Sequence, residues 1–262
     1  MQSDTPTVIQ ACNVCFAYSS LAAALIDVSL ALPRGAMAAL IGANGSGKST
    51  LIRLLAGLLA PASGEVVFNG APLSSLHLRE RAKRIAYVPQ STSTVFPFTA
   101  LEVVLTGRSP YGGRFRFESS HDEEIAFAAL DALDVGHLST RHITELSVGE
   151  RQLVTVARAL AQEPEVMLLD EPASALDLKH RTQLTGSLRR LRDERGITVL
   201  LITHDLMLLD SAADLIFAMK CGQVVAHGPP GVVLNDTVLG DVYDTHVRTL
   251  RTNGRTFVWS EL

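Results

Sequence analysis

Apolar runs rich in valine, isoleucine and leucine alternate along the chain with segments of helical periodicity. The most continuous runs cover residues 37–41, 166–169 and 198–203. Parallel strands that are buried on both faces show such runs, because helices cover both sides of their sheet. The pattern therefore predicts an α/β fold with a mainly parallel sheet.

The start and the middle of the chain depart from this pattern. Segments 8–16, 26–32 and 65–68 predict half-buried strands, and Asn69-Gly70 is a strong turn signal. From about residue 91 to residue 157 the strand signals fade and helical patterns dominate. There, a capping box from Ser120 to Glu123 predicts an amphipathic helix that runs through about Leu133.

Three further interpretations concern the helical region and the tail. The acidic run 122–124 is interpreted as charges of a first helical turn on a solvated face. Segment 107–117 is rich in glycine and arginine, contains three aromatic residues, and predicts an exposed loop. The tail after Gly231 is short and less patterned than the rest.

Composition narrows the class of protein. The chain has 262 residues, is 47% hydrophobic and 19% charged, and has a net charge of −4. This length fits one large α/β domain or a domain with an inserted lobe, and it can bury a sizeable core without disulfides or structural metals. The mildly acidic balance lacks the basic stripe of a nucleic-acid-binding protein and the polybasic cue for anionic lipid, so no nucleic acid partner is expected.

The mean hydropathy of +0.22 is high for a chain without a membrane span. A span needs about 20 consecutive apolar residues, and the runs here have only the length of strands. The N-terminal residues 1–4 lack a basic region, so no secretory signal is expected and the cytoplasm is predicted. Cys12 and Cys15 form a C-x-x-C inside an expected strand, where residues three apart point to opposite faces, so partly buried thiols are expected rather than a redox or metal centre.

The segment 42–50 matches G-x-x-x-x-G-K-[ST], between the strand 37–41 and a helical pattern at 51–59. Its glycines let backbone N–H groups curl around phosphate oxygens, and the helix N-terminus adds a positive dipole. Lys48 is expected to reach the β- and γ-phosphates, and the Ser49 hydroxyl is expected to bind Mg²⁺. The predicted nucleotide site comprises Gly42, Asn44, Gly45, Ser46, Gly47, Lys48, Ser49 and Thr50.

Two carboxylates, Asp170 and Glu171, directly follow the apolar strand 166–169. An acid at the end of a buried strand needs a partner, and Mg²⁺ beside the phosphate loop would supply one. Asp170 is therefore predicted to hold the metal through water. Glu171 is predicted to polarise an attacking water.

Residues 146–152, Leu-Ser-Val-Gly-Glu-Arg-Gln, resemble the signature motif of ATP-binding cassette (ABC) ATPases, which usually reads L-S-G-G-Q. Other stretches are similar to further motifs of that family, in its order and spacing over residues 8–228. They are a Q-loop ending at Gln90, a D-loop ending at Asp177, a switch histidine at His204 and an adenine-stacking aromatic at Tyr18.

The resemblance implies a homodimer in which two cassettes pack head-to-tail around ATP. The signature residues of one copy would close over the ATP bound to the other, by means of Ser147, Val148, Gly149 and Glu150. Gln90 would sense Mg²⁺ and the attacking water, while His204 would contact the γ-phosphate and help to position Glu171. Asp177 is assigned to the same nucleotide site.

The signature departs from the family pattern at two positions. Glu150 in place of the terminal glutamine is a mild variation. Val148 in place of the first glycine is less mild, because a β-branched residue does not readily adopt a positive φ. We expect slower turnover or a shifted closure geometry, not inactivity.

The resemblance also implies the fold class: a P-loop NTPase (RecA-like) core with an antiparallel β-subdomain and an inserted α-helical subdomain. Residues 1–90 are expected to form the core with the β-subdomain and the phosphate loop, and residues 91–157 the α-helical signature subdomain. Residues 158–230 would continue the core with the metal-binding strand, D-loop and switch histidine, and residues 231–262 would form a short C-terminal tail.

A softer resemblance lies at residues 104–111, Val-Leu-Thr-Gly-Arg-Ser-Pro-Tyr, which are similar to the V-x-x-G-R-x-P-[YH] stretch of ATPases serving iron-siderophore, haem and vitamin B12 importers. It implies two separate membrane permease subunits, a substrate-binding protein that acts indirectly, and a peripheral place on the cytoplasmic face of the inner membrane. Haem, ferric siderophore, cobalamin and molybdate stay open as cargo. The alternative is a soluble ABC ATPase that acts on a protein scaffold, for example in iron–sulfur cluster assembly.

The surface expected to meet the permeases is the segment 91–104 that follows Gln90. Pro97 and Phe98 are the candidate docking residues. An exposed apolar groove is expected there, because interaction sites of this kind present contiguous apolar surface.

Overall fold

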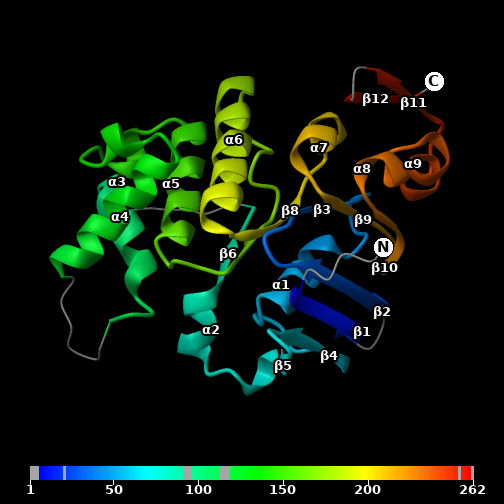
Figure 1. The fold of residues 1–262 in the computed structure, drawn as a ribbon, viewed down its shortest axis with the longest axis horizontal. Helices are drawn as coiled ribbons and strands as arrows, with labels where there is room; N and C mark the ends of the chain where they lie inside the picture. The colour runs from blue at the N-terminus through cyan, green and yellow to red at the C-terminus, as the bar shows by residue number, and fades with distance from the viewer. Residues whose placement is uncertain (1–5, 20–21, 91–95, 113–118, 253–254, 261–262) are drawn as a thin grey trace. The chain divides into compact units, whose positions relative to one another are not determined.

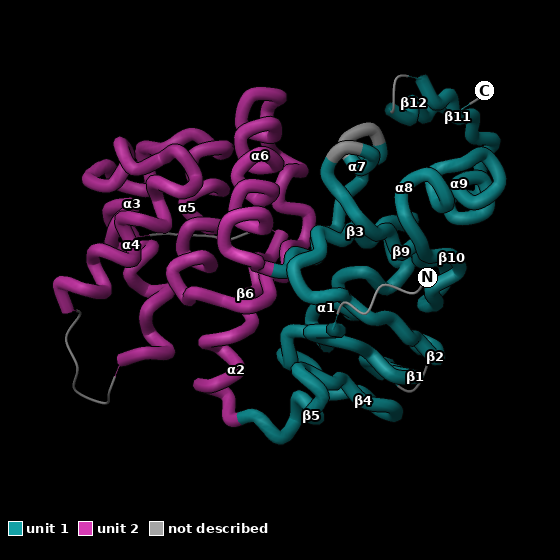
Figure 2. Tube along the Cα trace, viewed as in Figure 1, with its two compact units in different colours: residues 1–76, 198–262 teal, residues 77–197 magenta. Residues whose placement is uncertain are grey.

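The computed structural model of the chain describes residues 6–19, 22–90, 96–112, 119–252 and 255–260. Two compact units can be distinguished: residues 1–76 together with 198–262, and residues 77–197 (Figure 2). The first unit contains the phosphate loop and the switch histidine. The second contains the Q-loop, the signature motif, the Asp170–Glu171 pair and the D-loop.

An antiparallel sheet with strand order β2-β1-β4-β5 opens the first unit. Its strands are β1 (Thr7–Ser19), β2 (Ala22–Pro33), β4 (Ser63–Phe68) and β5 (Ala71–Pro72). The three strands expected from the alternating segments are all present, although β1 and β2 are longer than expected. Asn69 and Gly70 connect β4 to β5 with φ angles of 49° and 79°, which is the left-handed pair that a tight hairpin turn requires.

Buried parallel strands form the second sheet layer of this unit. β3 (Met37–Gly42) pairs in parallel with β8 (Thr198–Ile202) and β9 (Leu215–Lys220), and β10 (Gln223–Gly228) adds to β9 in antiparallel orientation. All six residues of β3 are buried, as the continuous apolar run predicts. The helix α1 (Lys48–Leu55) follows the phosphate loop and ends four residues before the helical pattern at 51–59 does.

The C-terminal segment is more ordered than its sequence pattern suggested. It contains α8 (Pro230–Val233), α9 (Asp236–Tyr243) and the hairpin β11 (Val247–Thr252) to β12 (Arg255–Ser260), and it follows α7 (Leu206–Ala212) by way of β9 and β10. Leu239 and Val242 of α9 are buried in one hydrophobic cluster with Ile41 of β3 and Ile216 of β9. The segment therefore completes the core beside the phosphate-loop strand.

The second unit is mainly helical. Its parallel strands β6 (Ile85–Val88) and β7 (Val166–Leu169) pair along their full length, and β7 has the expected bounds. Its helices include α2 (Leu78–Arg84), α3 (Ala100–Leu105), α4 (Ser120–Ala132), α5 (Val148–Leu160) and α6 (Leu178–Arg195). Figure 1 shows α3, α4 and α5 grouped together, and residues of all three helices contact one another. The mixed α/β architecture is the expected one.

Two local expectations in this unit were wrong. The capping box of α4 is formed by Ser119 and Asp122 instead of Ser120 and Glu123, so the helix begins one residue earlier in register. Gly107 and Arg108 do not lie in an exposed loop, because they form a buried 3₁₀ turn with Thr106 directly after α3. Residues 113–117 of that expected loop lie outside the described residues.

Asp122 also contradicts the interpretation of the acidic run as a solvated face. Its side chain is buried and paired with Arg108, whereas Glu123 and Glu124 are exposed as expected. Over the residues described here, no helix is both long enough and apolar enough to cross a membrane.

The burial of α9 leads to a stability prediction for the C-terminal segment. Leu239 is fully buried, so Leu239→Ala should lower the free energy of unfolding in urea by about 2–5 kcal/mol. Leu250→Ala is the matched control, because this leucine on β11 is 55% exposed and should change the free energy by no more than about 0.5 kcal/mol. Equal effects of the two substitutions would show that α9 contributes nothing to the core.

Candidate functional site

The phosphate loop is held between the end of β3 and the start of α1. Gly47 is the N-cap of α1 and has a φ of 101°, and a Cβ there would lie 2.7 Å from the carbonyl oxygen of Ala24. Glycine is therefore required by both the backbone conformation and the lack of space. The Ser46 carbonyl oxygen accepts from the Gly222 N–H at 3.1 Å, which fixes the loop against the turn between β9 and β10.

Lys48 lies within this loop and is only 5% exposed. Its Nζ donates to the carbonyl oxygens of Gly42 and Ala43, both at 2.8 Å, and lies 3.4 Å from the Ser46 Oγ. A buried ammonium group needs such oxygen partners. The loop thus holds the cation among its own backbone atoms, where phosphate oxygens are predicted to bind.

The N-terminus of α1 fits an anion. In this fully described helix, no side chain caps the first turn and no acidic residue occupies it. The unpaired N–H groups and the dipole of a helix N-terminus favour phosphate oxygens. By contrast, α3, α4 and α5 each begin with a capping box made by their own side chains.

Two more predicted nucleotide contacts belong to the same unit. Tyr18 near the end of β1 is 62% exposed, and its hydroxyl lies 3.3 Å from the Thr50 Oγ1 of α1. Phe16 supports the Tyr18 ring edge-on, with ring centroids 4.9 Å apart, so the aromatic face of Tyr18 has a fixed position for stacking. His204 is exposed and lies two residues after the end of β8.

The predicted metal and water-activating residues lie in the other unit, at the carboxyl ends of β6 and β7. Asp170 is only 1% exposed, its N–H donates to the Val88 carbonyl oxygen at 2.8 Å, and the Tyr87 hydroxyl donates to its Oδ2 at 3.3 Å. Gln90 Nε2 donates to the Glu171 Oε2 at 2.9 Å. The structure therefore brings Gln90 and Glu171, which were each predicted to act on the attacking water, within hydrogen-bonding distance.

Glu171 has an unusual backbone conformation. Its φ is 49°, in the left-handed region that a residue with a long side chain rarely adopts. Strain of this kind costs on the order of 1–3 kcal/mol and concentrates at functional sites. It turns the chain sharply out of β7 and leaves the carboxylate within reach of Gln90.

The signature motif forms the start of α5. Ser147 is the N-cap, its Oγ accepts from the Glu150 N–H at 3.2 Å, and the Glu150 Oε2 accepts from the Ser147 N–H at 2.8 Å. Hydrogen bonding of the carboxylate with the Ser147 side chain, and next with the Ser147 backbone N–H, lowers the pKa of the Glu150 carboxyl group. Glu150 therefore performs the capping role that glutamine can also perform, which supports the expectation of a mild variation.

Val148 does not meet the backbone problem expected from its sequence. It is the first residue of α5, its φ is not positive, and its side chain is 52% exposed. The positive φ on which this expectation was based is therefore absent, because this position of the motif is helical, while slower turnover or a shifted closure geometry stays a prediction. Only the added side-chain volume distinguishes Val148 from glycine here.

Sequence reasoning missed a residue that joins the signature motif to the D-loop. Asp177 caps α6 by accepting from the His180 N–H and lies 2.8 Å from the His180 Nδ1. A Cβ on Gly149 would lie 2.8 Å from the same imidazole ring. His180 thus contacts both motifs, and its place as the third residue of the D-loop helix was the only available signal.

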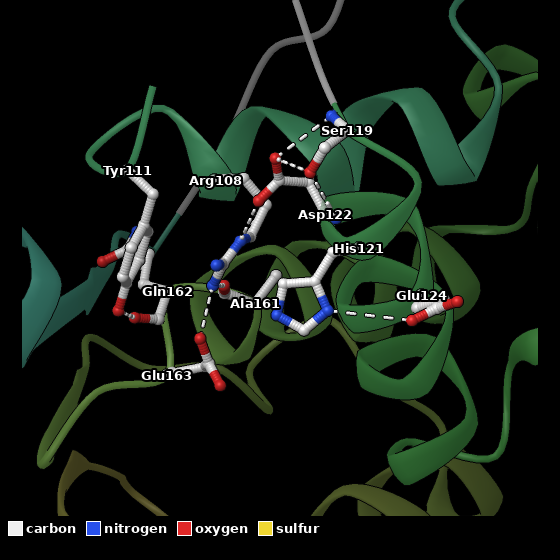
Figure 3. Close-up of polar contacts among 9 residues, drawn as sticks. All are labelled: Arg108, Tyr111, Ser119, His121, Asp122, Glu124, Ala161, Gln162 and Glu163. Carbon is white, nitrogen blue, oxygen red and sulfur yellow. Dashed lines mark hydrogen bonds and ion pairs between the residues drawn. The ribbon is translucent and has the colours of Figure 1, made fainter. Parts of the chain in front are cut away.

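The Gly-Arg-Ser-Pro-Tyr stretch forms a buried polar network with α4 and the segment after α5 (Figure 3). Arg108 is 6% exposed and donates to Asp122 Oδ1 at 3.1 Å, to Glu163 Oε2 at 2.7 Å and to the Ala161 carbonyl oxygen at 2.8 Å. The Tyr111 ring covers the guanidinium group at 3.9 Å. This stretch therefore holds helices together inside the unit.

Phosphate binding by a loop between a buried strand and an uncapped helix is the defining property of P-loop NTPases, and this protein is of that class. Within the class, residues 25–174 match the ABC transporter family. The hemin import ATP-binding proteins of Nocardia farcinica and Myxococcus xanthus are 42% and 40% identical to the chain. The matches cover 86% and 87% of this chain and 77% and 86% of those proteins.

Solved structures agree with the sequence relatives. A metal-chelate type ABC transporter in an inward-facing conformation is similar over 97% of this chain and 96% of its own, with a TM-score of 0.83 and 30% identity. A dimeric bacterial ABC transporter cassette is similar over 85% of this chain and 98% of its own, with a TM-score of 0.75 and 29% identity. The chain belongs to the ABC transporter family and is an ATP-binding ATPase of that family.

The capping geometry at the signature motif leads to a prediction. Glu150→Gln should leave the urea unfolding free energy unchanged within about 0.5 kcal/mol, because the amide oxygen can accept from the Ser147 N–H. Glu150→Ala should lower it by about 1 kcal/mol. Glu123→Ala is the control, since Glu123 lies in the first turn of α4 outside its capping box. If Glu150→Gln lowered the unfolding free energy as much as Glu150→Ala does, the result would contradict the capping role.

The ionisation of Asp122 should make stability depend on pH. Hydrogen bonding from the Ser119 side chain, followed by the Arg108 guanidinium group, lowers the pKa of Asp122 to about 2. Because the folded pKa is below the unfolded value near 4, the carboxylate stabilises the fold above pH 4, and this contribution disappears as the pH falls toward 2. The difference in unfolding free energy between wild type and Asp122→Asn should therefore shrink between pH 5 and pH 2 in urea titrations. A difference that does not change over this range would contradict the assignment.

Proposed function

We propose that this ATPase works as a homodimer on two integral membrane permease subunits and powers uptake of a metal chelate. The observation that carries the proposal is the similarity, over most of both chains, to proteins named hemin import ATP-binding proteins. The metal-chelate type transporter among the structural neighbours supports the same cargo class. The relatives favour import over action on a soluble scaffold. Haem is the first cargo to test, ahead of ferric siderophores and cobalamin.

In the proposed reaction, the phosphate loop and Lys48 bind the phosphates of ATP while Tyr18 stacks on the adenine. ATP acts with Mg²⁺, which would neutralise phosphate charge. The buried carboxylate of Asp170, the Ser49 hydroxyl and the Gln90 amide are oxygen donors of the kind that Mg²⁺ prefers, so the residues present fit the ion.

Glu171 is the proposed residue that polarises the attacking water. The hydrogen bond that Gln90 donates to one carboxylate oxygen at 2.9 Å orients the group, and a carboxylate held in this way can act as the base that accepts a proton from water. His204 would contact the γ-phosphate. Ser147 and the N-terminus of α5 from the second copy would complete the site by stabilising charge on the γ-phosphate.

The proposed permease contact lies after Gln90. Residues 91–95 of the expected docking segment lie outside the described residues. Beyond them, Phe96 and Phe98 are 66% and 50% exposed, with ring centroids 6.0 Å apart, and the Pro97 carbonyl oxygen lies 2.6 Å from the His142 Nδ1. Two exposed aromatic rings beside a backbone held by His142 support this segment as the surface that docks on the permeases at the cytoplasmic face of the membrane.

The hydrolysis step and the partners can be tested together. Lys48→Ala should abolish ATP binding in equilibrium dialysis, whereas Glu171→Gln should bind ATP, lose hydrolysis and accumulate as a dimer in analytical ultracentrifugation. Glu194→Gln, an exposed acid on α6, is the matched control and should behave like wild type.

The Glu171→Gln protein with ATP should also capture a polytopic permease pair from membranes of the native host. Proteoliposomes that contain these permeases should then take up haem only with ATP. Recovery of soluble scaffold proteins alone would contradict the transport function, and uptake of another chelate in place of haem would correct the cargo.

A further inference from the structure

Arg108 forms a hydrogen bond with the C-terminal end of α5, the helix that begins at the signature motif. The carbonyl group of Ala161, the C-cap residue of α5, has no partner in the next helical turn and accepts from Arg108 Nη1 at 2.8 Å. The Tyr111 hydroxyl donates to the next carbonyl group, that of Gln162, also at 2.8 Å. A cation at a helix C-terminus also interacts favourably with the helix dipole. This contact is therefore both directional and electrostatic.

The backbone beside Arg108 contacts the same turn directly. A Cβ on Gly107 would clash with the carbonyl oxygen of Arg158 and would lie 3.3 Å from the Ala161 Cβ. Only glycine allows the 3₁₀ turn to approach α5 so closely. The Gly-Arg-Ser-Pro-Tyr stretch thus contacts the end of α5 through its backbone, a guanidinium group and a phenol.

Glu163 contributes to this contact at a conformational cost. Its φ is 52°, which costs a residue with a side chain on the order of 1–2 kcal/mol relative to the right-handed region. The Glu163 carboxylate accepts from Arg108 at 2.7 Å, and Asp122 accepts from the other side of the guanidinium group (Figure 3). Glycine would adopt this φ without strain but would leave the cation with one carboxylate fewer.

We propose that this group is a clamp that positions the signature motif for closure over ATP. The clamp comprises Arg108, Tyr111, Asp122 and Glu163. The clamp fixes the direction of α5. The position of Ser147, at the opposite end of that helix, depends on this direction. The proposal rests on the head-to-tail dimer of the proposed function, in which Ser147 reaches the ATP of the second copy.

Because α5 is long, a small change of direction at its C-terminal end displaces the signature motif at its other end. The helix has 13 residues and is therefore about 20 Å long. A tilt of about 3° at the clamp moves the opposite end by about 1 Å over that length. A displacement of about 1 Å in a group that contacts a reacting ligand can cost on the order of 100-fold in rate. The clamp residues are not among the predicted nucleotide contacts, so the proposal assigns them as positioning residues.

The experiment measures ATP-driven dimerisation in the Glu171→Gln background, with and without a disrupted clamp. Arg108→Ala should raise the ATP concentration needed for half-maximal dimerisation about tenfold or more. Dimerisation is measured by analytical ultracentrifugation. The affinity of the monomer for ATP, measured by equilibrium dialysis, should change less than about twofold, because the phosphate loop is intact. Arg108→Lys keeps the charge without the planar fork and should give an intermediate shift.

A second variant separates positioning from stability. Glu163→Gly relieves the strained φ and removes one carboxylate from the clamp, so thermal stability should be retained while dimerisation still requires several-fold more ATP. Arg190→Ala is the matched control, because Arg190 likewise bonds a carbonyl group at a helix C-terminus, that of Ala132, and a carboxylate, that of Asp134, but on the exposed surface. It should dimerise like the parent.

The outcomes distinguish this proposal from the function on which it rests. Dimerisation of Arg108→Ala and Glu163→Gly at the parental ATP concentration would overturn the clamp and leave the proposed function intact. Equal losses in monomer ATP binding and in dimerisation would also overturn it, because they would show general damage. Failure of the Glu171→Gln parent to dimerise with ATP would overturn both.

Discussion

The backbone groups left unpaired at helix ends are the constraint on which this structure depends. The helices α3, α4 and α5 satisfy their first N–H groups with capping boxes of their own, and α6 does so with Asp177. For α1, by contrast, the described first turn has Gly47 at its N-cap and no side-chain partner. The dipole of this helix points at the loop where the phosphates are proposed to bind, and α2, α7 and α8, which also lack a side-chain cap among the described residues, do not follow that loop. The helix that carries the signature motif is capped tightly at its start and clamped at its end.

The residues that make local structure could be predicted from the sequence, because their signals are short-range. The phosphate loop, the bounds of β7 and the Asn69-Gly70 turn all depend on neighbours within a few positions. The family motifs assigned Gln90 and Glu171 to one site although they lie 81 positions apart, but they did not predict the hydrogen bond between them. The register of the α4 capping box was wrong by one residue because Ser119-Ser120 is followed by Asp122-Glu123, and both frames satisfy the same pattern.

The buried network around Arg108 could not be predicted, because its partners come from distant positions. Glu163 lies 55 positions from Arg108, and no local pattern distinguishes an arginine that will be buried from one in a loop. The order of the C-terminal segment could not be predicted for a different reason. Its strands alternate weakly and its helix α9 is short, so its order comes from packing Leu239 and Val242 against the strands β3 and β9. Much of the high mean hydropathy is thereby explained by buried core, with exposed aromatic residues such as Phe96 adding to it.

At two glutamates of this protein, a strained backbone presents a carboxylate to a partner. Five of the eight described non-glycine residues with positive φ are Asn or Asp, whose short side chains tolerate that region. Glu163 and Glu171 have longer side chains, which do not favour this region. The Glu163 carboxylate pairs with Arg108, and the Glu171 carboxylate accepts from Gln90. Glycine would relax the backbone at either position and would remove the group that the conformation presents. The same argument that connects strain at Glu171 with its proposed role in catalysis therefore connects strain at Glu163 with the proposed clamp at the end of α5.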